Sequence, residues 1–268
     1  MRATMPAAAM PAPGATVAPV PAISIRAVSK VFGSSGNAVH ALDKVSIDVA
    51  PGEFVCLLGA SGCGKSTLLN LVAGLDRPSA GDIHVEGSRT SLMFQEAALF
   101  PWLTVAGNVD LALRLAGVAK SDRRRRVGEL LQMVHLEEYA KKMPHELSGG
   151  MRQRVALARS LAQRADVLLM DEPFGALDAM TRDLLHDELE GLWLQQGLSV
   201  MFVTHNVREA VRLGDRVILL SSRPGRVADD FPVPFERPRR IEDPQVAGLA
   251  GTITDRLREE VRRHADDQ

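Results

Sequence analysis

Cysteine is scarce in this chain of 268 residues, and neither sign of charge dominates. Two cysteines, Cys56 and Cys63, are too few for the disulfide framework of a small secreted domain, which suits a reducing compartment. Lys and Arg number 32 against 33 Asp and Glu, so the formal net charge is −1. Because there is no overall basic field, nothing indicates a nucleic-acid partner. The hydrophobic content of 46% is enough for a sizeable core, and the length fits one domain with a subdomain.

A continuous apolar run is also missing, although residues 3–25 carry no charge. The prolines in this stretch are Pro6, Pro11, Pro13, Pro19 and Pro21. At this density they prevent a continuous membrane-spanning helix, and the stretch lacks the apolar h-region of a secretory signal. We therefore expect residues 1–22 to form a disordered, Ala/Pro-rich tail. No internal repeat is evident.

A glycine-rich loop is the first feature that predicts chemistry. Residues 54–58 are an apolar run typical of a buried strand, and residues 59–67 follow as GASGCGKST. They contain the full pattern G-x-x-x-x-G-K-[ST], in which loop N–H groups cradle phosphates, Lys65 reaches the β/γ oxygens and Ser66 faces Mg²⁺. The alternative is a chance glycine-rich turn, which the strand before and the helix after the loop disfavour.

A second apolar run, residues 167–170, ends in Asp171 and Glu172. Adjacent side chains on a strand point in opposite directions, so the two carboxylates should have different tasks. Hydrolysis of a γ-phosphate needs mainly positioning and charge neutralisation, for which a metal, a lysine and one oriented carboxylate suffice. The alternative is that Asp-Glu-Pro is merely a polar strand exit.

Between these motifs, residues 147–150 read LSGG. A Ser-Gly-Gly that opens a helix offers a second anion site, because helix N-termini carry free N–H groups and the positive end of the dipole. If both elements serve one nucleotide, they come from different copies of the chain. With these motifs the sequence resembles the ATPase subunit of an ATP-binding-cassette (ABC) transporter over residues 23–235.

The resemblance implies an α/β fold: a P-loop NTPase core with a mostly parallel sheet, an antiparallel β subdomain, and a helical signature subdomain at about residues 97–163. Strands and helices alternate after residue 167, which also indicates parallel strands. Residues 236–268 are expected to be a tail with an exposed amphipathic helix at 245–263. A helix at 122–133 should begin with Ser121 as its cap, with the run 123–126, four arginines, on a solvated face; a lipid or partner contact is the alternative.

The resemblance implies a role for each of four polar residues. It implies that Asp171 holds Mg²⁺ and that Glu172 orients the attacking water. It also implies that Gln95 touches Mg²⁺ or the water and that His205 contacts the γ-phosphate. The expected catalytic residues are Glu172, His205, Gln95 and Lys65. The expected Mg²⁺ ligands are Ser66, Gln95 and Asp171. The residues expected to contact ATP are Phe32, Gly59, Ala60, Ser61, Gly62, Cys63, Gly64, Lys65, Ser66, Thr67, Ser148, Gly149, Gly150 and Asp178.

Several of these residues have plainer alternatives. A lone histidine is more often a surface or core residue, and Phe32 either stacks on adenine or simply packs at a strand end. Cys63 is either an oxidisable thiol or, as we favour, an inert packed residue. Large apolar residues just after Gln95 are interpreted as a groove for a permease helix or, alternatively, as subdomain core: Leu99, Phe100, Trp102 and Leu103.

Residues 94–109 (FQEAALFPWLTVAGNV) and 221–240 (SSRPGRVADDFPVPFERPRR) resemble the ATPases of nitrate, sulfonate and taurine importers. The implied partners are a second copy of the chain, integral membrane permease subunits and, indirectly, an extracytoplasmic solute-binding protein. The implied location is peripheral, at the cytoplasmic face of the membrane, and no residue identifies the solute.

Alternatives are another importer substrate or a soluble ABC ATPase acting on DNA or ribosomes. About eighty residues separate the two glycine motifs, too few for the long coiled coils of such soluble proteins. A P-loop kinase or GTPase would lack LSGG, and a binding-only relic should have a damaged catalytic set.

Overall fold

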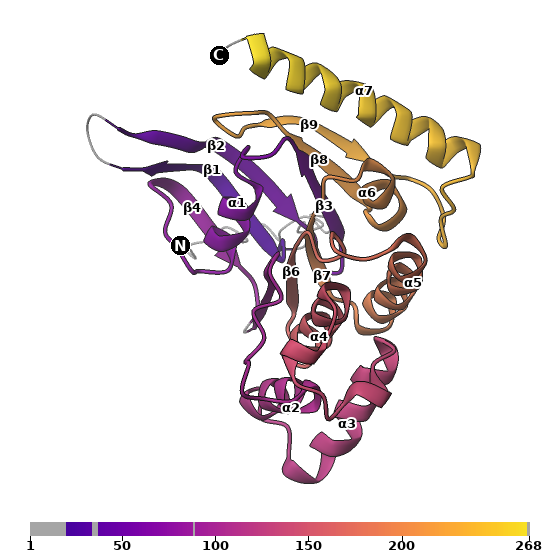
Figure 1. The fold of residues 1–268 in the computed structure, drawn as a ribbon. Helices are drawn as coiled ribbons and strands as arrows, with labels where there is room; N and C mark the ends of the chain where they lie inside the picture. Colours follow the sequence, from indigo (N-terminus) through magenta and orange to yellow (C-terminus); the bar gives the residue numbers. More distant parts are fainter. Residues whose placement is uncertain (1–19, 34–36, 88, 267–268) are drawn as a thin grey trace, which may run out of the picture.

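The computed structural model describes residues 20–33, 37–87 and 89–266, so most of the expected tail at 1–22 lies outside the described residues. Two sheets form the centre of the fold, and the helices from the middle of the chain gather at one end of it (Figure 1). Among the described residues, none of the helices is both long enough and apolar enough to cross a membrane.

The central sheet has six strands in the order β5-β6-β7-β3-β8-β9. They are β5 (Thr90–Met93), β6 (Val167–Asp171), β7 (Ser199–Val203), β3 (Phe54–Gly59), β8 (Arg216–Leu220) and β9 (Val227–Pro232). All neighbours pair in parallel except β8 and β9, which are antiparallel. Every residue of β3, β6 and β7 is buried, as expected for parallel strands covered on both faces. The carboxyl ends of these three strands therefore meet at one edge of the sheet.

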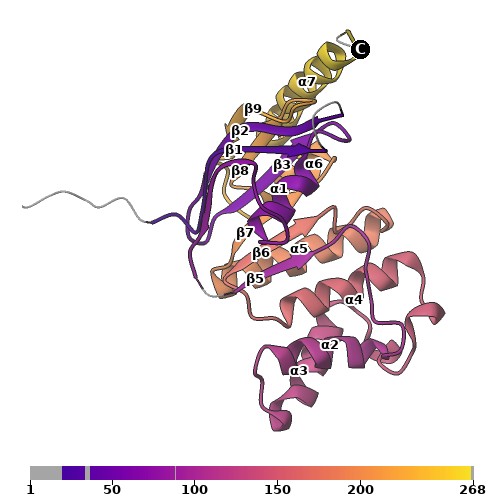
Figure 2. The same cartoon turned by 90° about the vertical axis from the view of Figure 1, so that its left-hand side faces the viewer.

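The second sheet is antiparallel and has three strands in the order β2-β1-β4. They are β2 (Val39–Val49), β1 (Ile23–Phe32) and β4 (Ala80–Val85). Alternate residues of β1 and β2 point inward and share one apolar core with α1 (Lys65–Val72) and one face of the central sheet. Figure 2 shows this sheet lying beside α1. The predicted α/β core with an added antiparallel sheet is confirmed.

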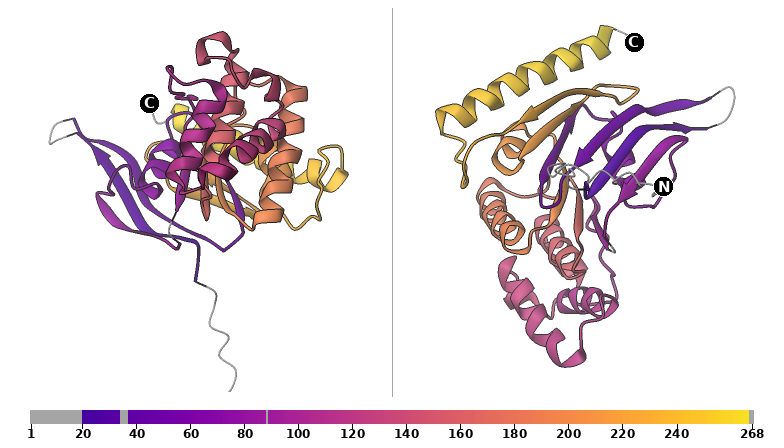
Figure 3. Two further views of the ribbon diagram at one scale, coloured as in Figure 1. Left: turned by 90° about the horizontal axis from the view of Figure 1, so that it is seen from below. Right: turned by 180° about the vertical axis from the view of Figure 1, so that it is seen from behind.

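The helical section between β5 and β6 contains α2 (Val105–Leu115), α3 (Lys120–Met133) and α4 (Gly149–Leu161), with the 3₁₀ turns η1 (Glu137–Tyr139) and η2 (Pro144–Glu146). The first two helices pack against α4 at the end of the molecule away from the antiparallel sheet (Figure 3). The remaining helices are α5 (Ala179–Gln196), α6 (Val207–Leu213) and α7 (Pro244–Asp266).

Two expectations about these helices were wrong. Ser121 does not cap α3: the helix begins at Lys120 with Ala119 in the N-cap position, where the Ala119 carbonyl accepts the first backbone hydrogen bonds. Nor is α7 merely an exposed tail, because Val246, Ala250 and Ile253 belong to the main apolar core. The arginine run does lie on a solvated helix, where Arg125 and Arg126 both pair with Glu129 on the next turn.

Candidate active site

The phosphate-type loop joins β3 to α1. Gly59, Gly62 and Gly64 all have positive φ, and Gly64 is the N-cap of α1. A β-carbon on Gly64 would lie 2.6 Å from Leu42 Cδ2 and 2.8 Å from the Ala41 carbonyl oxygen, so only glycine fits there. The loop therefore turns tightly onto the N-terminus of α1, which is a favourable place for an anion.

Lys65 lies across this loop. Its ammonium donates to the carbonyl oxygens of Gly59, at 2.9 Å, and Ala60, at 3.0 Å. The ammonium is thus held at the mouth of the loop by groups that a phosphate can replace. The Cys63 side chain is buried in the apolar core beneath, and this burial raises the pKa of its thiol. A thiol that is buried and protonated behaves as a packing group, in line with the favoured interpretation.

Asp171 ends β6, and its side chain is only 8% exposed. Burial raises the pKa of this carboxyl, while a hydrogen bond from Ser66 and the charge of Lys65 act in the opposite direction. Its Oδ1 atom is buried and has no hydrogen-bond partner among the described residues. A buried acceptor without a partner is costly and needs an explanation, such as a bound ion.

Glu172 follows at once, with a φ of 46°. Positive φ is unfavourable for a residue with a side chain and often marks a functional position. The Glu172 carboxylate lies 3.1 Å from His205 Nδ1 and 3.5 Å from Gln95 Nε2. Because Gln95 follows β5 and His205 follows β7, the parallel sheet brings all three side chains to its carboxyl edge.

The Ser-Gly-Gly segment and Asp178 occupy helix starts elsewhere. Ser148 caps α4 by accepting a hydrogen bond from the Met151 amide, and Asp178 caps α5 by accepting one from the Thr181 amide, which lowers the pKa of its carboxyl. Within the described part of the chain, no hydrogen bond joins Ser148, Gly149 or Gly150 to the phosphate-type loop. The predicted ligands therefore form two separate groups in a single copy.

Phe32 ends β1 and is 43% exposed, so it does not simply pack in the core. The Lys30 ammonium lies 4.9 Å from the centroid of its ring. Lys30 is itself held by Asp76, at 2.7 Å, and by the Arg77 carbonyl. The ring thus has one face near a fixed cation and retains surface open to a ligand.

Two features near the site were not predicted. The hairpin between β8 and β9 places the Arg223 guanidinium against the loop: a β-carbon on Gly62 would be 2.9 Å from Arg223 Nη2. Arg223 has no ion pair or hydrogen bond among the described residues. The RPGR motif was a signal for it, but only as a mark of family. Buried Glu209 and His186, behind His205, had no sequence signal at all.

The geometry agrees with comparisons to known proteins. Residues 42–175 match the family model described as ABC transporter. The chain is 47% identical over 242 residues to an aliphatic sulfonates import ATP-binding protein of Mesorhizobium japonicum, covering 88% of each chain. It is 44% identical to the nitrate import ATP-binding protein of Synechocystis over 79% of this chain and 82% of that one. A solved structure of the ATP-binding cassette MJ0796 is also similar to this chain, with 32% sequence identity and a TM-score of 0.73. The match covers 80% of this chain and 100% of that one. That structure is described as a dimer in a post-hydrolysis state bound to ADP and phosphate.

The family model spans half the chain, and both relatives exceed 40% identity over most of it. The loop at residues 59–67, Asp171 at the end of β6, Glu172 directly after it and the histidine after β7 all lie at the carboxyl ends of neighbouring parallel strands. The chain belongs to the ABC transporter family and is an ATP-binding ATPase of that family.

Proposed function

We propose that this chain is the ATP-hydrolysing subunit of a membrane importer for small anionic or organic solutes of the sulfonate, taurine or nitrate type. The observation that carries the proposal is the convergence of Gln95, Glu172 and His205 beside the phosphate-type loop. Support for import comes from the relatives, which are named as sulfonate and nitrate import ATP-binding proteins. Taurine is itself a sulfonate, so one chemical class covers much of this range.

ATP binds with its phosphates on the loop and its base on Phe32. The loop amides and Lys65 neutralise the β- and γ-phosphates. The open surface of the Phe32 ring supports adenine stacking. Cys63, whose side chain is buried beneath the loop, acts through its backbone. This assignment keeps the predicted contact set Gly59, Ala60, Ser61, Gly62, Cys63, Gly64, Lys65, Ser66 and Thr67.

Mg²⁺ fits the donor set beside the loop. Asp171 has a buried oxygen without a partner and a hydrogen bond with Ser66, and Gln95 is the third predicted ligand. The described residues contain no group of three His, Cys, Asp or Glu side chains that could hold a metal alone. That agrees with Mg²⁺ sites in which one carboxylate, a hydroxyl, waters and phosphate oxygens share the ion. When bound, the ion would neutralise charge on the β- and γ-phosphates.

Glu172 accepts a hydrogen bond from the attacking water and orients it toward the γ-phosphate. His205 lies 3.1 Å from that carboxylate, and it contacts the γ-phosphate when ATP is bound. Gln95 lies at the long limit of hydrogen bonding to the same oxygen, at 3.5 Å, so it can shift when nucleotide binds. Positioning and charge, rather than covalent chemistry, supply the rate.

Two copies assemble head to tail around two ATP molecules. The Ser148–Gly150 segment and Asp178 of one copy complete the nucleotide site of the other. Two observations support this arrangement: these residues do not bond to the loop of their own copy among the described residues, and the MJ0796 cassette is described as dimeric. The free N–H groups at the start of α4 supply the anion contact.

A permease subunit docks at a hollow of about 680 Å³ between the end of β5 and α2. Apolar side chains dominate its wall: Leu75, Leu92, Phe94, Phe100, Leu111 and Leu115. Of the four residues expected at the docking surface, Phe100 lines this hollow. Trp102 is exposed beside it, 71% accessible, and Leu99 packs against the core. The core alternative is therefore wrong for Trp102.

Docking to a permease would keep the ATPase at the cytoplasmic face of the membrane, and a solute-binding protein would act on it only through that permease. No residue of the site would meet the solute, so a different importer substrate is the second candidate. A soluble role on DNA or ribosomes is disfavoured, because the relatives are named as import proteins.

The test is reconstitution in liposomes with a permease and a solute-binding protein of a sulfonate, taurine or nitrate importer from the same organism. We expect sulfonates, taurine or nitrate to stimulate ATP hydrolysis and to accumulate inside. The matched control is Glu172→Gln, which should bind ATP but hydrolyse it about a hundred-fold more slowly or worse. Stimulation by chemically unrelated solutes only, or near-normal hydrolysis by Glu172→Gln, would contradict the proposal.

A further inference from the structure

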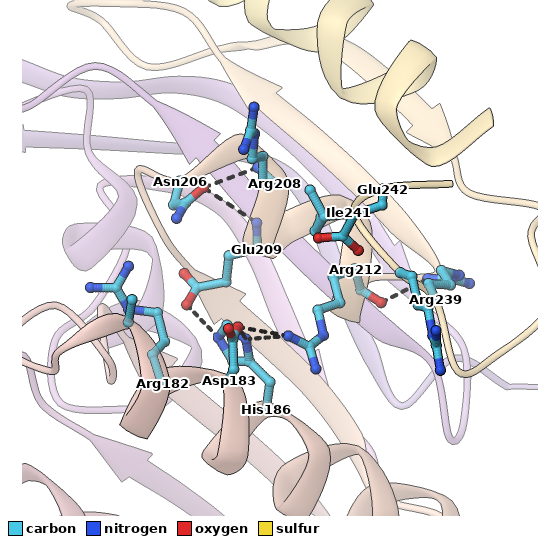
Figure 4. Close-up of a pocket in the computed structure, with 12 residues that line it drawn as sticks. Arg182, Asp183, His186, Asn206, Arg208, Glu209, Arg212, Arg239, Ile241 and Glu242 are labelled. Atoms are coloured by element: carbon cyan, nitrogen blue, oxygen red, sulfur yellow. Dashed lines mark hydrogen bonds and ion pairs between the residues drawn. The ribbon is translucent and has the colours of Figure 1, made fainter. Parts of the chain in front are cut away.

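A short chain of buried polar side chains lies directly behind the candidate active site. His186 on α5 is 3% exposed, Glu209 on α6 is 6% exposed, and Thr204, the residue before His205, is also buried. Figure 4 shows Glu209 reaching from α6 toward His186 on α5, along the wall of a pocket of about 550 Å³. None of these three residues has a role in the hydrolysis described above.

Hydrogen bonds link these three side chains to one another without a gap. His186 Nε2 lies 2.8 Å from Glu209 Oε1, and the Thr204 hydroxyl bonds to Glu209 Oε2. Because a carboxylate only accepts, the imidazole N–H and the hydroxyl must both donate to it. The Thr204 oxygen then accepts from the Asn206 amide at 3.0 Å. On the other side of the ring, Arg212 Nη1 lies 3.4 Å from His186 Nδ1 (Figure 4).

The ends of the chain lie in the two segments that carry the proposed catalytic groups. Thr204 and Asn206 flank His205, so bonds to the Thr204 side chain and the Asn206 amide set the backbone on both sides of it. At the other end, His186 lies two turns into the helix that Asp178 caps. Its ring also meets Phe174, two residues after Glu172, edge to face with centroids 5.0 Å apart.

We propose that Glu209 and His186 are positioning residues for His205: Glu209 fixes the turn that presents the histidine, and His186 ties that turn to α5, the helix that Asp178 caps. The inference rests on the proposed role of His205 in hydrolysis. A buried carboxylate must keep its hydrogen bonds, so Glu209 permits only one arrangement of this turn. Any movement of α5 when a second copy contacts Asp178 passes through His186 to the histidine.

Precise placement matters because misplacement of a catalytic group by about 1 Å can cost about a hundred-fold in rate. The hydrogen-bonded group of His186, Glu209 and Thr204 should affect ATP binding and catalysis differently. Binding of ATP to a single copy depends mainly on the loop and Phe32, which His186, Glu209 and Thr204 do not touch, whereas the chemical step depends on His205. Loss of Glu209 should therefore lower kcat and leave the affinity for ATP nearly unchanged.

The experiment is a double-mutant cycle in the full-length chain, with kcat measured at saturating ATP and divided by the folded fraction. We expect Glu209→Ala to lower kcat about ten-fold or more, with the Kd for ATP within about two-fold. In a His205→Ala background the same change should cost nothing further, because its effect passes through the histidine. Glu209→Gln should keep most of the activity, since an amide can accept from His186 and donate to Thr204.

Glu190→Ala is the matched control. Glu190 is also a buried carboxylate on α5, but it pairs with Arg237, at 2.6 Å, away from His205. The substitution Glu190→Ala should lower the melting temperature while leaving kcat per folded molecule unchanged. If Glu209→Ala does not fold, His186→Leu and His186→Gln form the second pair, with the loss of kcat expected for leucine alone.

The outcomes test the role of His205 separately from the positioning role of Glu209 and His186. Normal hydrolysis by His205→Ala would remove the proposed role of the histidine itself. If His205→Ala is impaired, the inference is overturned by an unchanged kcat in Glu209→Ala and His186→Leu, or by losses that multiply in the double variant. Equal losses of kcat in Glu190→Ala and Glu209→Ala would mean that these buried groups only stabilise the core. That result would also overturn the inference.

Discussion

Arg223 is an exposed cation beside the phosphate-type loop. It is exposed at the tip of the β8–β9 hairpin, lies against Gly62, and has no partner among the described residues. Arg226, on the same hairpin, pairs with Asp43 at 2.6 Å. The hairpin is fixed to the loop, since a β-carbon on Gly225 would come 2.1 Å from the Cys63 carbonyl oxygen. Arg223 therefore keeps a free positive charge next to the phosphate-type loop.

We predict that Arg223→Ala weakens the binding of ATP and ADP by about two- to five-fold, because an exposed charge contributes about 1 kcal/mol or less. The affinity of the variant should also depend less on salt. Arg226→Ala removes an equal charge from the same hairpin and should change the affinity less. Titration calorimetry at two salt concentrations measures both. Equal effects of the two variants would assign the change to general charge rather than to contact with the loop.

At the scale of elements, α2 and the segment after β5 form the wall of the hollow assigned to the permease. Leu115, at the end of α2, is 78% exposed and lines this hollow. Phe100 lines it too and carries Arg159 over its ring, at 5.7 Å. Exposed apolar groups gathered around a concave surface are typical of an interface.

We predict that Leu115→Glu abolishes association with the permease without lowering the melting temperature, because the new carboxylate is buried only when the partner docks. Leu194→Glu is the matched control: Leu194 is 59% exposed on α5 and does not line the hollow. Co-purification with the permease and thermal unfolding provide the two readouts. Trp102→Ala should likewise leave the melting temperature unchanged. A clear fall in melting temperature for Leu115→Glu would indicate a packing role instead.

For the whole molecule, the two groups of predicted nucleotide ligands require two copies. Lys65→Ala destroys the loop site of its own copy, and Ser148→Arg blocks the segment offered to the partner. A heterodimer of these variants contains one site with both changes and one site with neither. We predict that the isolated heterodimer hydrolyses ATP at about half the wild-type rate if the sites act independently, and that an equimolar mixture that pairs at random reaches about a quarter.

Hydrolysis by the wild-type chain should also rise more steeply than linearly with protein concentration while the free chain is mainly monomeric. If the mixed variants stay inactive although tagged heterodimers are isolated, the shared-site arrangement is contradicted.

Much of the fold followed from local patterns. The apolar run at 54–58 became β3 with one more residue, the run at 167–170 became β6 with one more residue, and the helix expected at 245–263 became the longer α7. The strand β5 was missed because it has only four residues and is defined by backbone pairing with β6. The cap of α3 was misplaced because the helix starts two residues earlier than its charged sequence indicated.

The sequence by itself determined the motifs whose chemistry is local. A glycine loop, a lysine and a helix start lie within nine residues, so backbone geometry alone relates them. Tertiary structure decided everything that depends on strand order. It brought Gln95 and His205 to Glu172, set Arg223 against Gly62, left Trp102 in solvent, and buried Glu209 between His186 and Thr204. These contacts join segments that are far apart in the sequence, so helix or strand periodicity cannot predict them. Packing of the sheet edge and its helices brings the segments together.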